Sequence, residues 1–170
     1  MKQFAPIDPL TIESDPRVVG SIENNTNIPG RMCLLIDGSH AIIFDYGYYT
    51  HPQTKESRWL TYQLEFPKAG LRWIVDALTI KFVKPPEEGG LPGGVFHYEE
   101  VVDGEELAIN RAMGLGTNDN RQSGYIFKTL SRFDEYESVK NLSFTDAFLF
   151  DHGFLKLIED TAERVERGEL

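Results

Sequence analysis

The stretch LTYQLEFPKAGLRWIVDAL, residues 60–78, decides the fold. From residue 59 to residue 66 the even-numbered side chains are apolar, whereas the odd-numbered ones, which begin with Trp59, lie on the opposite face, as in a half-buried strand. Pro67 suits the first turn of a helix, where its missing N–H is not needed. Apolar residues then recur at helical spacing, which predicts a helix over 68–83 that ends before the prolines at 85–86.

A second stretch, FTDAFLFDHGFLKLIEDTA, residues 144–162, aligns with the first without gaps, 84 positions further along the chain. Phe66 then matches Phe150, and Asp76 matches Asp160. At the same offset, 40–47 falls on 124–131. Self-similarity at a fixed distance indicates a repeated architecture. It predicts a second helix over 151–167, although chance likeness between two strand–helix segments stays open as the alternative.

Two hairpin turns complete each copy. Asp37-Gly38 and Asp103-Gly104 each lie between apolar runs, which is the strongest local hairpin signal. Each copy is therefore expected to read ββββα. We predict an α+β fold in which two antiparallel sheets face outward and the two helices pack between them. Polar residues 114–124 predict a flexible loop, and 143–150 predict a strand. The expected parts of this one merged domain are an irregular N-terminal arm (1–16), the first repeat (17–84), a linker (85–93) and the second repeat (94–170).

Composition narrows the class of protein. The 170 residues are 41% hydrophobic, which suffices for a core, and the net charge is −10. A single cysteine, Cys33, excludes an intramolecular disulfide and a multi-cysteine metal site, and it favours a cytoplasmic location. No run approaches the roughly 18 apolar residues that span a membrane. The acidic, proline-rich first residues do not resemble a signal peptide, so no membrane partner is expected.

The doubled ββββα pattern resembles the Whirly and Pur families and the related positive coactivator of transcription. The likeness lies in the joint between strand and helix, where Pro67, Gly70 and the trio Asp76-Ala77-Leu78 resemble the corresponding joint of a Pur repeat. It is strongest over 40–83. The resemblance implies a fold that binds single-stranded nucleic acid. The lysine-rich motif of plant Whirly proteins is missing, so no binding residue is transferred and each is argued from this chain.

Basic residues concentrate on the predicted strands. Residues 31–84 have seven basic and five acidic residues, and 111–132 have four and one, whereas 85–110 have seven acidic residues and no basic one. Sequence-tolerant strand binding needs cations together with aromatic side chains, and each base stacked on them contributes about 1–3 kcal/mol. The sequence therefore predicts non-catalytic binding of single-stranded DNA or RNA. The expected binding residues are Tyr46, Tyr48, Tyr49, Lys55, Arg58, Trp59, Arg111, Arg121, Tyr125, Phe127, Lys128 and Arg132.

Two alternatives stay open. Outward aromatic residues also suit a protein-interaction or oligomeric scaffold module, so a homo-oligomer is left open. An enzyme is not expected, because the chain has no phosphate-binding loop and no G-x-S-x-G motif. His97 shares a strand face with Glu99, but two candidate ligands without a third make a poor metal site. The sequence thus predicts no catalytic residue, no metal and no cofactor.

Overall fold

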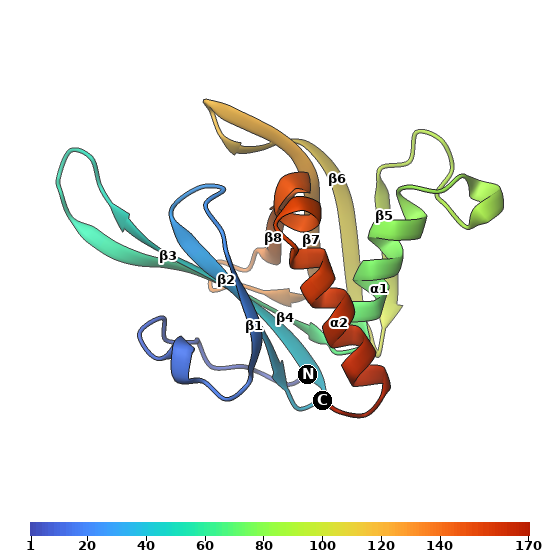
Figure 1. Ribbon diagram of the computed structural model, residues 1–170, viewed down its shortest axis with the longest axis horizontal. Coiled ribbons are helices and arrows are strands. Elements are labelled where there is room, and N and C mark those ends of the chain that lie inside the picture. Colours follow the sequence, from blue (N-terminus) through green and yellow to red (C-terminus); the bar gives the residue numbers. More distant parts are fainter.

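The computed structural model describes residues 1–170 and contains two four-stranded antiparallel sheets (Figure 1). Both sheets are ordered as their strands follow in the chain, so every neighbouring pair is joined by a hairpin. Sheet A consists of β1 (Val18–Glu23), β2 (Gly30–Asp37), β3 (His40–Thr50) and β4 (Ser57–Pro67). Sheet B consists of β5 (His97–Val102), β6 (Glu105–Thr117), β7 (Asn120–Phe133) and β8 (Val139–Thr145). The chain is therefore of the α+β class, as the sequence predicts.

Each sheet is followed by a helix. The helix α1 (Gly70–Asp76) continues into the π-helical turn η2 (Ala77–Lys81), so the first helix is close to the expected one. The second differs at its start. A separate π-helical turn, η4 (Ala147–Asp151), comes first, and Gly153 in the left-handed region (φ 87°) separates it from α2 (Phe154–Glu166). Neither α1 nor α2 is long and apolar enough to cross a lipid bilayer.

The two Asp-Gly dipeptides form the hairpin turns that the sequence predicts. Between β5 and β6, Asp103 (φ 45°) and Gly104 (φ 83°) both lie in the left-handed region, which a type I′ turn requires at its two central positions. Between β2 and β3 only Gly38 (φ 64°) does so, the pattern of a type II′ turn with Ser39 as its second central residue. The turns fix the register of both sheets, and through it the face of every strand residue.

Two local predictions are wrong. Residues 114–124 are not a flexible loop, because β6 and β7 continue through them to a two-residue turn at Asn118-Asp119. Gly114 lies in a bulge, where the register shifts between Ala112 and Leu115. Residues 143–150 are a strand only as far as Thr145, since Ala147–Asp151 turns helical. An apolar composition typical of strands therefore does not predict the backbone conformation of residues 143–150.

One core joins both sheets and both helices. The inner face of each sheet, which we define as the face toward the helices, supplies Leu34, Ile43 and Phe66 from sheet A and Ile109 and Phe127 from sheet B. The rings of Phe66 and Phe127 meet edge to face, with centroids 5.0 Å apart. The helices α1 and α2 contact each other and supply Leu71, Trp73, Ile74, Phe154, Ile158 and Ala162 to the same core.

The outer face of sheet A has its own cover. The N-terminal arm is irregular except for the short 3-10 turn η1 (Ile12–Ser14), and it places Ile7 and Ile12 against Cys33, Leu35, Ile42, Phe44 and Tyr46. Ile12 is only 1% exposed. Gln63 holds the middle of the arm, because its Oε1 accepts the Ile7 N–H at 2.8 Å and its Nε2 donates to the Ala5 carbonyl. Only the part of this face that the N-terminal arm leaves uncovered is open to solvent.

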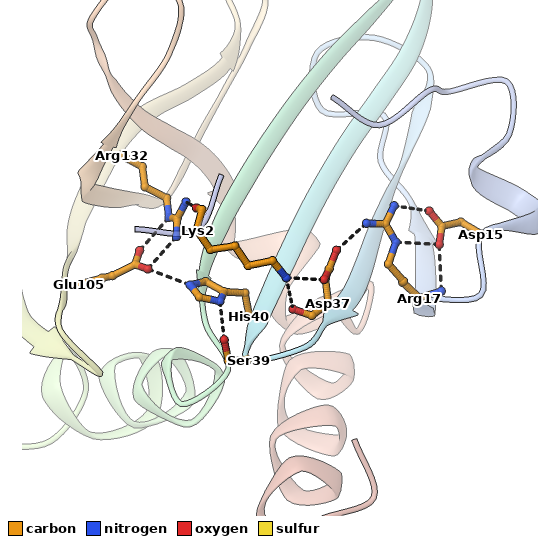
Figure 2. A network of polar contacts seen from close by, with 8 residues as sticks. All are labelled: Lys2, Asp15, Arg17, Asp37, Ser39, His40, Glu105 and Arg132. Atoms are coloured by element: carbon orange, nitrogen blue, oxygen red, sulfur yellow. Dashed lines mark hydrogen bonds and ion pairs between the residues drawn. The ribbon is translucent and has the colours of Figure 1, made fainter. Parts of the chain in front are cut away.

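Polar contacts tie the start of the chain to both sheets (Figure 2). The Lys2 ammonium bonds to Asp37 in sheet A at 2.6 Å, while the Lys2 carbonyl accepts an N–H from Arg132 in sheet B at 2.9 Å. Arg132 forms two 2.7 Å hydrogen bonds with Glu105, whose Oε1 also lies 2.8 Å from Nε2 of His40. The two sheets are thus joined by buried charge as well as by the core.

Candidate nucleic-acid interface

The far part of the β3–β4 hairpin, residues 46–62, projects from the body of the molecule (Figure 1), and we call it the aromatic arm. The strands β3 and β4 pair from His40 and Pro67 out to Thr50 and Ser57. The neighbouring strand β2 pairs with β3 only as far as Gly30, opposite Gly47. Beyond Gly47 the arm is therefore a two-stranded ribbon with both faces open to a partner.

The outer face of the arm carries three aromatic side chains in one patch. Tyr48 and Trp59 are cross-strand partners whose ring centroids lie 5.1 Å apart in an edge-to-face arrangement. The ring of Tyr46 lies 5.9 Å from that of Trp59. Trp59 is 39% exposed and Tyr48 is 53% exposed, whereas Tyr46 is buried. Trp59 lies on the face opposite Leu64, as strand alternation predicts, and it remains accessible together with Tyr48.

The inner face of the arm is aromatic as well. Tyr49 lies opposite Arg58 in the register, and its ring contacts the ring of His51 edge to face. Tyr62 is 59% exposed on the same face. Tyr62 shares the inner face with Leu64, which is 1% exposed, but the hydrophobic core does not include Tyr62. An extended strand therefore meets aromatic surface on both sides of this hairpin.

Cations without carboxylate partners lie on the arm and beside it. Lys55 lies in the hairpin loop in the left-handed region (φ 62°), and Arg58 lies on β4; both are exposed and neither forms an ion pair. Arg31 pairs in register with Tyr46 and forms no ion pair either. Its guanidinium donates to the Ser21 hydroxyl at 3.0 Å and to the Ser21 carbonyl at 3.5 Å. Positive charge without a carboxylate partner is what a phosphate backbone requires.

Arg31 was missing from the set that the sequence predicts. The signal that identifies it is the Asp37-Gly38 turn, since a two-residue hairpin that pairs Asp37 with His40 must also pair Arg31 with Tyr46. Counting outward from a turn places residues across a sheet even when they are far apart in the chain.

The prediction that Tyr125 and Phe127 of the second half stack on bases is wrong. Tyr125 is 6% exposed and Phe127 is 1% exposed, and both point inward, opposite Phe144 and Leu142 of β8. Phe127 lies between Phe66 and Trp73 in the core. The pKa of Tyr125 is raised because burial penalises the phenolate. These rings hold the core together and have no surface on which a base can stack.

The prediction that Arg111 and Arg132 bind phosphates is also wrong. Arg132 is buried in its ion pair with Glu105, so its charge is already compensated. Arg111 forms a bidentate pair with Asp146 at 2.6 and 2.7 Å, and its guanidinium covers the ring of Tyr125 at 4.7 Å. Their carboxylate partners lie 27 and 35 positions away in the chain, too far for local sequence patterns to find.

Arg121 and Lys128 remain as unpaired cations of sheet B. Arg121 is exposed near the turn of the β6–β7 hairpin. Lys128 is half-buried on the outer face of sheet B, in register with Ala108 and Asn141. No aromatic side chain shares that row of the sheet. The structure thus separates the predicted residues into the aromatic arm, which combines cations with rings, and two isolated cations on the other sheet.

A half-buried carboxylate lies at the root of the arm. Asp45 accepts a hydrogen bond from Nδ2 of Asn24 at 3.1 Å, but no cation reaches it. Burial raises the pKa of Asp45, and the bond from Asn24 offsets this only in part. Burial likewise raises the pKa of the neighbouring Tyr46. The polar turn around Asn24 therefore places a partly desolvated acid beside the binding surface.

Other polar side chains gather away from the arm. No group of three or more histidine, cysteine, aspartate or glutamate residues lies close enough to hold a metal ion. His97 and Glu99 are hydrogen-bonded at 2.8 Å, as their shared face predicts. A chain that the sequence did not bring together runs from the Ser39 hydroxyl to Nδ1 of His40 (2.9 Å) and from Nε2 of His40 to Glu105 (2.8 Å), as Figure 2 shows.

Comparisons of the chain complete the description. Searches against models of protein families, against curated proteins and against solved structures found no match. The likeness to the Whirly and Pur families therefore stays a prediction from sequence, and the functional argument rests on the geometry of this chain alone.

Proposed function

We propose that the protein binds single-stranded DNA or RNA through the aromatic arm. Bases stack on Trp59 and Tyr48, and phosphates contact Arg31 on the same face, Lys55 in the hairpin loop and Arg58 on the inner face of the arm. Binding of this kind depends on ring faces and positive charge rather than on a reaction, and it tolerates different base sequences because every base has a π-face.

The observation that carries the proposal is the exposed Tyr48–Trp59 pair. Two large aromatic side chains remain accessible on a ribbon that has no third strand beside it. Unlike a single exposed ring, the pair forms a contiguous aromatic surface, which suits a binding partner. The unpaired cations on the same ribbon favour a negatively charged one.

The order of elements supports the same proposal, because the two halves of the chain resemble each other. The helices α1 and α2 begin at Gly70 and Phe154, which keeps the 84-residue offset of the two stretches. The strands do not keep it, because β4 runs to Pro67 whereas its counterpart segment has already turned helical. We infer a doubled ββββα unit whose two copies have diverged, with the first copy alone retaining the extended arm for binding.

Tryptophan fluorescence tests the proposal directly. A short unlabelled oligonucleotide is titrated into the protein at low salt, and the titration is repeated with rising salt. We expect quenching from Trp59, since the second tryptophan, Trp73, is buried in the core. A Trp59→Phe variant assigns the signal, because it keeps a stacking surface but loses the change in fluorescence.

The dependence on salt separates electrostatic binding from other contacts. The logarithm of the binding constant is expected to fall linearly with the logarithm of the salt concentration, with a slope of about −0.7 for each phosphate contacted on a single strand. The absence of binding at micromolar oligonucleotide, for both DNA and RNA, would refute the proposal. A comparison of the two nucleic acids also shows which sugar the arm prefers.

A protein-interaction or oligomeric scaffold module is the second candidate, and one observation favours it. The strand β5 is the free edge of sheet B, and Phe96 and Val101 beside that edge are 63% and 62% exposed. Exposed apolar side chains next to unpaired backbone groups suit pairing with another chain. Light scattering over a range of protein concentrations distinguishes this function, since a scaffold of this type gains mass as the concentration rises.

A further inference from the structure

Ser39, His40 and Glu105 form a relay that the binding function does not use. Nδ1 of His40 lies 2.9 Å from the Ser39 hydroxyl, and Nε2 lies 2.8 Å from Oε1 of Glu105. The side chains of His40 and Glu105 are only 12% and 10% exposed, whereas Ser39 is exposed at the β2–β3 turn. A hydroxyl, an imidazole and a carboxylate in this order are the parts of an activated serine nucleophile.

The surroundings of Glu105 fix the tautomer of the histidine. Burial raises the pKa of Glu105, but hydrogen bonds from Arg132 and His40 outweigh burial, so the net pKa is lowered and the carboxylate stays ionised. An ionised carboxylate only accepts hydrogen bonds, so Nε2 of His40 must carry the proton. In the neutral imidazole Nδ1 is then an acceptor, to which the Ser39 hydroxyl donates across the contact drawn in Figure 2.

The nucleophile opens onto a cavity. Ser39 lines a space of about 750 Å³ that is bounded by α1, α2 and β5. Its apolar lining comes from Trp73, Val102 and Val165. Its charged lining comes from Lys68, from Arg72, which is paired with Glu166, and from Asp76, Glu100 and Asp103. Apolar side chains of this size accommodate a short acyl chain.

We propose that Ser39 is the nucleophile of a second activity, the hydrolysis of carboxylic esters with a small acyl group. The Ser39 oxygen forms a bond to the carbonyl carbon while its proton moves to Nδ1 of His40. The bond to the alcohol then breaks, and the leaving alcohol takes that proton. Water, deprotonated by the same nitrogen, next attacks the acyl-serine and releases the acid, which restores the Ser39 hydroxyl.

Glu105 is a positioning residue in this scheme. It contacts no substrate, but it orients His40 and stabilises the positive imidazolium that forms during each step. Arg132 in turn holds Glu105 through two 2.7 Å hydrogen bonds. This activity is independent of the aromatic arm, because the relay lies at the other end of β3, so one proposal can fail while the other stands.

A fluorophosphonate probe tests the nucleophile. It phosphonylates an activated serine oxygen with loss of fluoride, and peptide mass spectrometry locates the adduct. We expect one adduct, on Ser39, that is absent from Ser39→Ala. General base catalysis contributes about 10²–10⁴-fold, so His40→Asn should slow labelling by at least about 100-fold. The turnover of p-nitrophenyl acetate should fall with it.

The controls separate chemistry from structure. Ser57→Ala removes another exposed serine, whose hydroxyl contacts only Thr50, and should leave labelling unchanged. Ser39→Ala keeps the bridge between His40 and Glu105, so it isolates the nucleophile from any loss of stability, which thermal unfolding of each variant measures. The proposal is overturned by the absence of an adduct on Ser39 in the folded protein, or by equal rates of labelling in a folded His40→Asn variant.

Discussion

Tyr48 and Trp59 pack edge to face across the β3–β4 hairpin, with their ring planes at 64° and no third strand to cover them. Each ring buries part of the other, so the pair orders itself before any ligand arrives. A preordered aromatic surface loses little conformational freedom on binding. This relationship is what gives the aromatic arm its proposed role.

Replacement of Trp59 by alanine should weaken oligonucleotide binding while the fold remains stable. The loss of one base stack of about 1–3 kcal/mol corresponds to a factor of roughly 5–150 in affinity. Leu64→Ala, on the inner face of the same strand, should instead cost about 2–5 kcal/mol of unfolding free energy, because Leu64 is 1% exposed. Fluorescence anisotropy of a labelled oligonucleotide and chemical denaturation measure the two effects.

A Tyr136→Ala variant is the matched control, since Tyr136 is 79% exposed in the β7–β8 turn, away from the arm. Its affinity should equal that of the parent protein. A Trp59→Ala variant as unstable as Leu64→Ala would contradict the assignment of faces.

The cations of the arm should determine the salt dependence. Lys55→Ala and Arg58→Ala are each expected to reduce the steepness of the log–log salt plot by about 0.7, because each removes one phosphate contact. Lys156→Ala is the control, since Lys156 lies on α2 and pairs with Asp160. An unchanged slope in both arm variants would remove these residues from the interface.

The sequence predicts the arm better than the rest of the site, for a physical reason. From residue 59 to residue 66 one face of β4 is polar except for Trp59, so alternation alone identifies the outward side. Around Phe127 both faces carry apolar residues, and only the packing of sheet B against sheet A decides which face is buried. The ion pairs of Arg111 and Arg132 join residues distant in the chain, so their burial follows from tertiary structure. Residues 114–124 form strands because the β6 part of this segment pairs with the β7 part.

The half-buried Asp45 at the root of the aromatic arm makes stability depend on pH. The pKa of Asp45 is raised from its ordinary value of 3.8 by burial. Below about that pH both the folded and the unfolded states hold the proton, and Asp45 has no effect. As the pH rises, the unfolded chain loses the proton first, so the folded state is destabilised until the pH passes the raised pKa. Asp45→Asn should therefore increase the unfolding free energy at pH 7 and leave it unchanged at pH 3.

Denaturant titrations at the two pH values check this sign. The side-chain amide oxygen that Asp45→Asn introduces can still accept the hydrogen bond from Asn24, so the substitution changes charge more than contacts. A variant less stable than the parent at pH 7 would show that the charge of Asp45 is compensated in the folded state.

The Glu105–Arg132 pair should be costly to break. Glu105→Gln leaves the Arg132 guanidinium buried without its carboxylate, which typically costs about 3–5 kcal/mol of unfolding free energy. Because the pKa of Glu105 is lowered from 4.5, the contribution of its charge is present above that pH and disappears as the pH falls through the lowered value. The difference between parent and variant should therefore shrink in acid. Glu166→Gln, which breaks the exposed pair with Arg72, should have a far smaller effect.

The N-terminal arm should stabilise sheet A. Ile12 is 1% exposed against Leu35 and Phe44, so Ile12→Ala is expected to cost about 2–5 kcal/mol. Leu10→Ala, in the same arm but 75% exposed, should have little effect. Equal stabilities of the two variants in thermal unfolding would mean that the N-terminal arm detaches from sheet A in solution.

The edge-to-face contact between Phe66 and Phe127 has a consequence for how the chain folds. Neither half of the chain has a complete hydrophobic core, because Phe66 in the first half packs against Phe127 in the second. Proteolytic cutting within 85–93 should therefore yield two fragments that remain associated and melt in a single cooperative transition, and that lose their structure when they are separated.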